Sequence, residues 1–287
     1  MSSLDHKIDF AVVLSVTSAN PNGDPLNGNR PRQNYDGYGE ISDVAIKRKI
    51  RNRLQDLGES IFVQSNDRKN DSFGSLRERA DDNEELNKIL KAKKSSGDDF
   101  AWVACQEWID VRSFGQVFAF KGGAKGEGVS VGVRGPVSVH TAKSVHPIDI
   151  TSMQITKSVN SEPGKDRGSD TMGMKHRVDY GLYVFYGSIN TQLAEKTGFT
   201  NEDAEKIKQT LVTLFENDLS SARPDGSMEI HHVYWWEHNS KLGQYSSAKV
   251  HRSLSVKPKI EEPKLFEDYK IELSELPGLK VEILDGL

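Results

Sequence analysis

The chain has 287 residues and a formal net charge of -4, and 36% of its residues are hydrophobic. This length suits one elaborate domain or two small ones. No apolar run approaches the roughly 18 residues of a membrane helix, and the start Met1-Ser-Ser-Leu-Asp5 has no signal-peptide pattern. The single cysteine, Cys105, excludes an intramolecular disulfide and favours a reducing compartment. We therefore expect a cytoplasmic protein without a membrane partner.

Charge is distributed unevenly along the chain. Residues 30–53 hold seven Lys or Arg against three Asp or Glu, whereas residues 201–287 hold eleven against sixteen. The overall acidity argues against a protein that coats nucleic acid by bulk charge. The basic segment nevertheless suits an anion, and the acidic portion suits a partner or a second copy of the chain.

The first elements predict a strand, a turn cluster and a basic helix. Apolar residues alternate from Ile8 to Val16, which indicates a strand. Three turn signals follow in Asn20-Pro-Asn-Gly-Asp-Pro25, with Arg30-Pro-Arg32 behind them. The next helix covers residues 41–57 with Ser42 as its N-cap, and its buried stripe is Ile46, Ile50, Leu54 and Leu57. Turn amides, guanidinium groups and a basic helix together favour phosphate binding, and an ordinary surface loop is the alternative.

The next stretch predicts an insertion and an arm. Residues 64–75 are polar and 76–94 indicate one charged helix, so residues 58–128 are predicted to be an insertion that is mobile in part. Val129, Val131 and Val133 alternate with other residues and predict the second strand of the main sheet. The segment 141–179 is too long for a hairpin loop and predicts a protruding arm.

The last part of the chain completes a βαββαβ order. Residues 180–189 predict a central strand, and Thr200 with Asp203 forms a capping box before an amphipathic helix. Met228–Trp236 is the fourth strand. This order is that of an α+β ferredoxin-like or RNA-recognition-motif fold. The predicted divisions are 1–57, 58–128, 129–140, 141–179, 180–256 and a C-terminal tail over 257–287.

Several cofactor sites are not expected. The glycines from Gly122 to Gly135 match neither the dinucleotide nor the P-loop pattern, so no nucleotide cofactor is predicted. His231 and His232 are adjacent in a strand and should point to opposite faces, which disfavours a shared metal. Three histidines of the arm region could act as acid or base in RNA cleavage, although surface placement is the favoured interpretation: His140, His146 and His176.

Two further features bear on RNA binding. Met172 and Met174 could fill a core or, on an exposed arm, insert between bases. On the first strand, the face opposite Phe10 carries Ala11 and Val13, which offer no aromatic ring for stacking. RNA would therefore be held by its backbone.

Several motifs together resemble one protein family over roughly residues 8–255. They are Asn20-Pro-Asn-Gly-Asp-Pro25, Arg30-Pro-Arg32, Ile41-Ser-Asp-Val44 leading to Lys47-Arg48 and Arg51, Asp110-Val-Arg-Ser-Phe-Gly115, and Met172-Gly-Met-Lys-His176 before Tyr180-Gly-Leu-Tyr183. This combination is similar to the CRISPR-associated backbone subunit of type I-C Cascade, the "seven" family of the repeat-associated mysterious proteins.

The resemblance implies an RNA-recognition-motif palm with inserted fingers and a protruding thumb. It implies several copies in a filament on a guide crRNA, whose bases pair with target DNA, together with other Cascade subunits. The implied role is antiviral defence without catalysis or a cofactor, and sequence choice is left to base pairing. The candidate RNA-binding residues are Asn20, Asn22, Arg30, Arg32, Ser42, Lys47, Arg48, Arg51, Arg134, Lys157, Met172, Met174, Lys175, His176 and Arg177.

The competing hypothesis is a metal-dependent endoribonuclease of the same superfamily. Relatives in type III complexes cut RNA with a loop aspartate, and this chain has Asp24 and Asp36 in loops. Each is more simply a turn residue, and no base or metal cluster accompanies it. A membrane-surface role for helix 42–57 is weaker still, because its apolar side lacks Trp and Phe.

Overall fold

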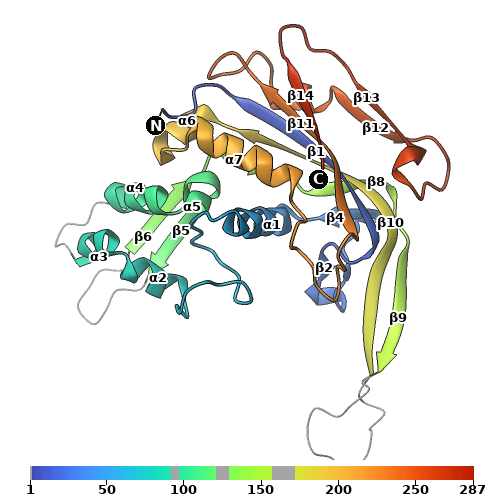
Figure 1. Ribbon diagram of the computed structural model, residues 1–287, viewed down its shortest axis with the longest axis horizontal. Coiled ribbons are helices and arrows are strands. Elements are labelled where there is room, and N and C mark those ends of the chain that lie inside the picture. Colours follow the sequence, from blue (N-terminus) through green and yellow to red (C-terminus); the bar gives the residue numbers. More distant parts are fainter. Residues whose placement is uncertain (1, 92–96, 121–128, 157–171) are drawn as a thin grey trace, which may run out of the picture.

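The computed structural model describes residues 2–91, 97–120, 129–156 and 172–287 (Figure 1). A large antiparallel sheet of eight strands organises this mixed α/β protein, in the order β14-β11-β1-β10-β8-β4, with β7 and β9 also paired to β10. The strands are β1 (Ile8–Ala19), β4 (Tyr38–Ile41), β7 (Val137–Val139), β8 (Ala142–Pro147), β9 (Ile150–Thr156), β10 (Met172–Ile189), β11 (Met228–Glu237) and β14 (Val281–Asp285).

The centre of the sheet confirms the three longest predicted strands. β1 lies between β10 and β11, and it is buried on both faces over most of its length. Phe10 is fully buried and stacks on Trp235, with ring centroids 5.7 Å apart. A Cβ at Gly187 would lie 2.1 Å from Phe10 Cζ. Glycine at this position therefore makes room for the largest side chain of β1.

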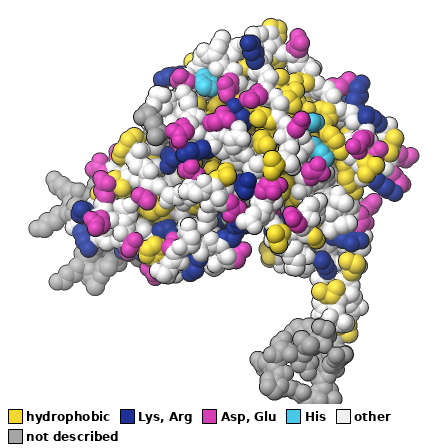
Figure 2. Space-filling view, viewed as in Figure 1, with side chains coloured by type: hydrophobic (Ala, Val, Ile, Leu, Met, Phe, Trp, Pro, Cys, Tyr) yellow, Lys and Arg dark blue, Asp and Glu magenta, His cyan; other side chains and the backbone are white. Residues whose placement is uncertain are grey.

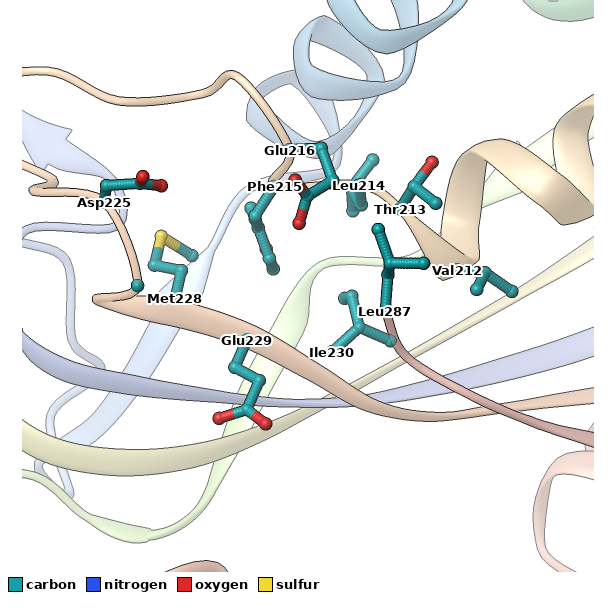
Figure 3. Close-up of a pocket in the computed structure, with 11 residues that line it drawn as sticks. Val212, Thr213, Leu214, Phe215, Glu216, Asp225, Met228, Glu229, Ile230 and Leu287 are labelled. Carbon is teal, nitrogen blue, oxygen red and sulfur yellow. The ribbon is translucent and has the colours of Figure 1, made fainter.

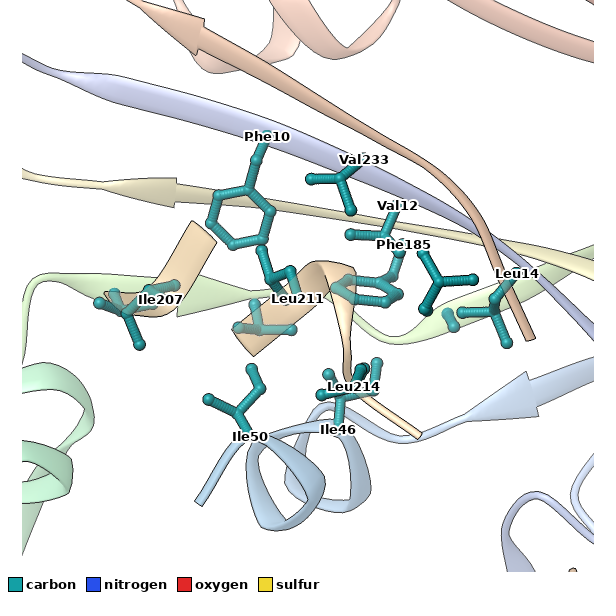
Figure 4. Close-up of a cluster of buried hydrophobic side chains, with 14 of the residues drawn as sticks. Phe10, Val12, Leu14, Ile46, Ile50, Phe185, Ile207, Leu211, Leu214 and Val233 are labelled. Carbon is teal, nitrogen blue, oxygen red and sulfur yellow. The ribbon is translucent and has the colours of Figure 1, made fainter. Parts of the chain in front are cut away.

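Two helices cover one face of the sheet, α1 (Asp43–Asp56) and α7 (Asn201–Val212) (Figure 1). Both predicted caps are present: the Ser42 hydroxyl accepts from Ala45 N–H, and Thr200 and Asp203 form the capping box. Leu57 was predicted to be buried but is 49% exposed, because α1 ends at Asp56. Figure 4 shows the core between helices and sheet, which includes Phe10, Val12, Leu14, Ile46, Ile50, Phe185, Ile207 and Leu211.

The C-terminal part of the chain covers the opposite face. It contains α8 (Ser247–His251), β12 (Leu254–Pro258), the short helix η2 (Phe266–Asp268) and β13 (Tyr269–Leu273), and β14 extends the sheet beside β11. Tyr234 and Trp236 lie in this second core. The inference that this face offers nothing to stack on was therefore incomplete, because β11 supplies aromatic rings. They are nevertheless closed to any ligand, with exposures of 4% and 2%.

The insertion forms a small subdomain with its own core. Its elements are α2 (Leu76–Asp82), α3 (Glu84–Lys91), α4 (Gly97–Glu107), α5 (Ile109–Phe114), β5 (Gly115–Phe120) and β6 (Val129–Arg134). The single helix predicted over 76–94 is two helices in the described part, because the Asn83 side chain accepts from Glu85 and Leu86 N–H groups and caps α3. The core includes Phe62, Phe100, Trp108 and Phe118.

The strand predicted at 129–133 exists but was assigned to the wrong sheet. β6 pairs with β5 inside the insertion subdomain, while β7 supplies the short neighbour of β10 in the main sheet. Alternation establishes a strand, but it does not identify the partner strand.

β9 and the first part of β10 form an arm that extends from the body in Figure 1, within the segment 141–179 predicted for it. The predicted bounds are too wide, because β8 at the start of that segment pairs with β4 and β10 in the main sheet. The helix α6 (Thr191–Thr197) was not predicted; Asn190 caps it and Gly198 ends it. The turn cluster contains β2 (Gly23–Asp24), the short helix η1 (Pro25–Asn27) and β3 (Arg30–Pro31). None of the described helices is long and apolar enough to cross a membrane.

Candidate nucleic-acid interface

The turn cluster after β1 is held by its own polar side chains. Asn20 Nδ2 donates to the Asn29 carbonyl over 2.7 Å, and the Asp24 carboxylate accepts from Leu26 N–H over 3.2 Å. Asn22 Oδ1 accepts from Ser42 N–H over 2.9 Å, which fixes the loop to the start of α1. The two asparagines and Ser42 therefore shape the loop through Asn20 Nδ2, Asn22 Oδ1 and the Ser42 N–H and hydroxyl groups.

A chain of hydrogen bonds joins this loop to the arm. Arg30 Nη1 donates to Ser152 Oγ over 2.8 Å, and Ser152 Oγ lies 2.8 Å from His176 Nδ1. Ser152 and His176 are directly opposite each other on β9 and β10. The basic loop thus contacts the root of the arm on the face that carries His176. Sequence analysis missed Ser152, because its role depends on the register between two strands.

The two faces of the arm differ in chemistry. Side chains alternate along a strand, so Met172, Met174 and His176 share one face of β10, and Lys175 and Arg177 share the other. Both methionines are about half exposed, at 51% and 55%. Figure 2 shows hydrophobic and cationic side chains together near the root of the arm. The methionines therefore do not fill a core.

The cations of this surface differ in how far they are already neutralised. Arg32 lies 3.4 Å from an Asp24 oxygen, and Arg177 Nε lies 3.5 Å from an Asp179 oxygen. Among the described residues, neither Arg30 nor Lys175 has a carboxylate within ion-pair distance. These two cations are the best placed to meet an external anion.

The basic side of α1 differs from the sequence prediction. Arg48 Nη1 donates to the Val63 carbonyl over 2.6 Å, and Arg51 Nε donates to Asp110 Oδ2 over 2.9 Å. The Arg51 side chain is only 11% exposed and that of Asp110 is fully buried. The expectation that both arginines lie on an exposed helix face is wrong, because the insertion subdomain packs there. Lys47 remains at the helix surface, 3.2 Å from Asp43.

The Asp110–Gly115 motif joins the insertion subdomain to the main body. Besides Arg51, the Asp110 carboxylate accepts from the N–H groups of Phe62 and Val63, at 2.7 and 3.1 Å. Arg112 donates to both carboxylate oxygens of Asp203 on α7, at 3.0 and 2.8 Å. The motif therefore has a structural role: it holds the insertion subdomain against α1 and α7.

The remaining candidates do not gather at one site. Arg134 lies on β6 in the insertion subdomain, on the side of the molecule away from the arm (Figure 1). Lys157 lies outside the described residues. His146 Nδ1 is 2.8 Å from the Tyr269 hydroxyl, whereas the His140 ring meets the His251 ring edge to face, with centroids 5.5 Å apart. The arm histidines therefore have separate partners and do not form an acid–base pair.

His231 and His232 correct another expectation. The β1–β11 register shifts here: Val13 pairs with His232 and Leu14 with Ile230, which leaves His231 as the extra residue of a bulge. Both rings lie near Phe266 in consequence, with centroid distances of 3.9 and 5.5 Å. The two histidines thus approach one neighbour. Within the described ranges, no three His, Cys, Asp or Glu residues are placed to hold a metal.

The two loop aspartates belong to turns. Asp24 accepts from its own turn, and the backbone N–H of Asp36 donates to Asn34 Oδ1. The cavity in Figure 3, about 460 Å³, lies between the end of α7, β11 and Leu287. Its lining has three carboxylates, Glu216, Asp225 and Glu229, and no Lys or Arg. That charge disfavours phosphate there.

The fold and the surface thus define a class of protein: a mixed α/β protein with a cationic loop next to a protruding arm. The family model described as "CRISPR-associated protein Cas7" matches residues 6–274. The chain therefore belongs to the Cas7 family.

One curated relative, a CRISPR-associated protein Cas7 of Haloferax volcanii, is 26% identical over 237 residues. The match covers 75% of this chain and 66% of that relative. Two solved chains come from structures titled "CRISPR RNA-guided surveillance complex, pre-nicking" and "CRISPR RNA-guided surveillance complex". Both are 16% identical to this chain and match 80% of it, with 78% and 68% of their own lengths covered and TM-scores of 0.49 and 0.45.

Proposed function

We propose that this Cas7-family chain is a multi-copy backbone subunit of a CRISPR surveillance complex, and that it holds the phosphate backbone of a guide crRNA. The main sheet is its palm, the insertion subdomain its fingers, and the β9–β10 arm its thumb. The subunit presents guide bases for pairing with target DNA, alongside further copies of itself and other subunits. The motifs from Asn20 to Tyr183 favour type I-C.

The observation that carries this proposal is the link from Arg30 through Ser152 to His176. It holds Arg30 on the face of the arm that carries His176, whereas Lys175 lies on the opposite face of the same hairpin. Neither cation has a carboxylate partner among the described residues, so an RNA strand that passes around the arm would meet both. Exposed guanidinium and ammonium groups bind phosphate oxygens whatever the base.

The sheet supports binding without sequence preference. Its two faces are covered by α1 and α7 on one side and by the C-terminal segments on the other. Bases therefore cannot lie flat on the sheet as they do on a typical RNA-recognition motif. Contacts must come from loops and the arm, which suits a guide whose sequence varies. The copies would join head to tail in an open filament, since heterologous contacts need not close.

The contacts of Asp24 support a non-catalytic role. The Asp24 carboxylate is engaged by Leu26 N–H and lies near Arg32, so its oxygens serve the turn. Incubation with RNA and Mg²⁺ or Mn²⁺ should leave the RNA intact, and cleavage lost in Asp24→Ala would contradict this assignment.

The test of the RNA site is the double variant Arg30→Gln/Lys175→Gln, assayed by filter binding of single-stranded RNAs of unrelated sequence. If each residue contacts one phosphate, the slope of log K against log salt should flatten by about 1.4, at about 0.7 per contact. At 0.1 M salt this corresponds to about a 25-fold loss of affinity, equal for every sequence.

Lys257→Gln/Lys270→Gln is the matched control, because it removes two charges from β12–β13 on the other side of the sheet. The control should keep the wild-type slope. Equal losses in both double variants would show that only overall charge matters, and an unchanged slope in the first would place the RNA site elsewhere.

A further inference from the structure

Tyr35 is the most exposed large hydrophobic side chain among the described residues. It stands at the tip of the turn between β3 and β4, with 110% of its reference surface accessible. Single exposed apolar residues are ordinary on protein surfaces. Tyr35 differs from such residues because its ring has no packing partner in the described part of the chain and is held on a well-defined turn beside a cationic loop. Such a ring is available to stack on a ligand.

The turn that carries Tyr35 is rigidly built. Asn34 Oδ1 accepts from the N–H groups of Asp36 and Tyr38, at 3.0 and 2.9 Å. The backbone closes with Asn34 N–H to the Tyr38 carbonyl and Gly37 N–H to the Asn34 carbonyl, at 2.9 and 3.2 Å. Gly37 adopts a φ of +81°, which favours glycine. Because the loop is already ordered, a ligand that meets the ring does not bear the entropy of ordering it.

Other aromatic rings are unsuited to stacking on a ligand near this surface. Tyr234 and Trp236 of the sheet are buried under the C-terminal segments. Trp102 is half exposed, but it lies on α4 of the insertion subdomain, against Gly198. Among the side chains that the structure describes, Tyr35 is therefore the large exposed ring next to the cationic loop.

Tyr35 is also close to a cation that can fix a phosphate. Arg32 precedes it by three residues, so their Cα atoms are at most about 10 Å apart, and the Arg32 side chain is 39% exposed. Proteins that bind single-stranded nucleic acid without sequence preference combine cations along the backbone with rings on which bases stack.

We propose that Tyr35 stacks on one unpaired base of the RNA strand that the neighbouring cations hold by its phosphates. This inference rests on the proposed function and adds a base contact to a site otherwise made of backbone contacts. The contact is tolerant of sequence, because every base has a π-face. It is also separate from the arm methionines, since it lies at the edge strand β4.

The test uses the full-length protein and single-stranded RNAs with 2-aminopurine at successive positions. Tyr35→Ala should lower affinity about 5- to 150-fold, the usual range for losing one base stack. The salt slope should stay unchanged, since no phosphate contact is lost. One 2-aminopurine position should be quenched by the wild-type protein and released in the variant, and Tyr35→Trp should restore both affinity and quenching.

Leu26→Ala is the matched control, because Leu26 is 96% exposed in the neighbouring turn and lacks an aromatic face. It should bind RNA as the wild type does. Equal losses in Leu26→Ala and Tyr35→Ala would overturn stacking in favour of a general apolar contact. If Tyr35→Ala instead weakens self-association without RNA, measured by sedimentation, the ring contacts a second copy and the proposal is wrong. Unchanged RNA binding in Tyr35→Ala would refute base stacking by Tyr35 but leave the proposed function standing. A wild-type protein that binds no RNA would refute both.

Discussion

Arg51→Ala should destabilise the protein far more than an ordinary surface substitution on a basic helix. Arg51 lies on α1 and its guanidinium donates to Asp110, a fully buried carboxylate of the insertion subdomain. The same guanidinium lies over the Phe114 ring, 5.0 Å from its centroid. The substitution therefore removes the cation from a buried ion pair and a contact between two parts of the fold.

The magnitude follows from what remains around Asp110. Breaking a buried pair by removing one partner costs about 3–5 kcal/mol, because the other charge is left uncompensated. Asp110 keeps hydrogen bonds from the N–H groups of Phe62 and Val63, which favours the lower end, about 3 kcal/mol. Lys47→Ala breaks only the surface pair with Asp43, which should contribute about 0.3–0.5 kcal/mol.

Thermal melts and urea unfolding of the two variants measure this difference. For a chain of this size, 3 kcal/mol corresponds to a Tm decrease of about 6–12 °C, against about 1 °C for Lys47→Ala. The double variant Arg51→Met/Asp110→Asn, which removes both charges and keeps an oxygen that can accept from Phe62 N–H, should recover part of the loss. A Tm decrease below about 2 °C in Arg51→Ala would refute the reasoning, since Asp110 would then not depend on its partner.

Two further substitutions test the core of the sheet. Burial alone would raise the pKa of Asp9, but hydrogen bonds, chiefly from His238, hold it below its ordinary value of 3.8. As pH falls below about 5, the folded state therefore binds fewer protons than the unfolded chain, and the free energy of unfolding should decrease. Urea unfolding at several pH values should show a weaker pH dependence in Asp9→Asn than in the wild type. The same pH dependence in both proteins would contradict this explanation. Gly187→Ala should cost about 1–3 kcal/mol, because its Cβ would lie 2.1 Å from Phe10 Cζ, whereas Gly132→Ala, with nothing within 4 Å, should melt like the wild type.

The sequence determined the elements whose signals are local. Alternation located β1, and the Ser42 cap and the Thr200 capping box located the starts of α1 and α7. These signals are read within a few residues, because side-chain direction and the first unpaired N–H groups of a helix depend on neighbours along the chain. The length of segment 141–179 likewise predicted the arm.

The tertiary structure decided everything that depends on which distant residue lies opposite. Two adjacent histidines on β11 could not reveal the register shift against β1 that brings both to Phe266. The basic residue Arg51 looked available for phosphate until packing placed buried Asp110 beside it. An ion pair, a register and a bulge depend on contacts between segments tens of residues apart, whereas a cap or a strand period depends on neighbours in the chain. Local chemistry therefore fixed where the helices and strands begin, and long-range packing fixed which of their charged side chains remain free to bind.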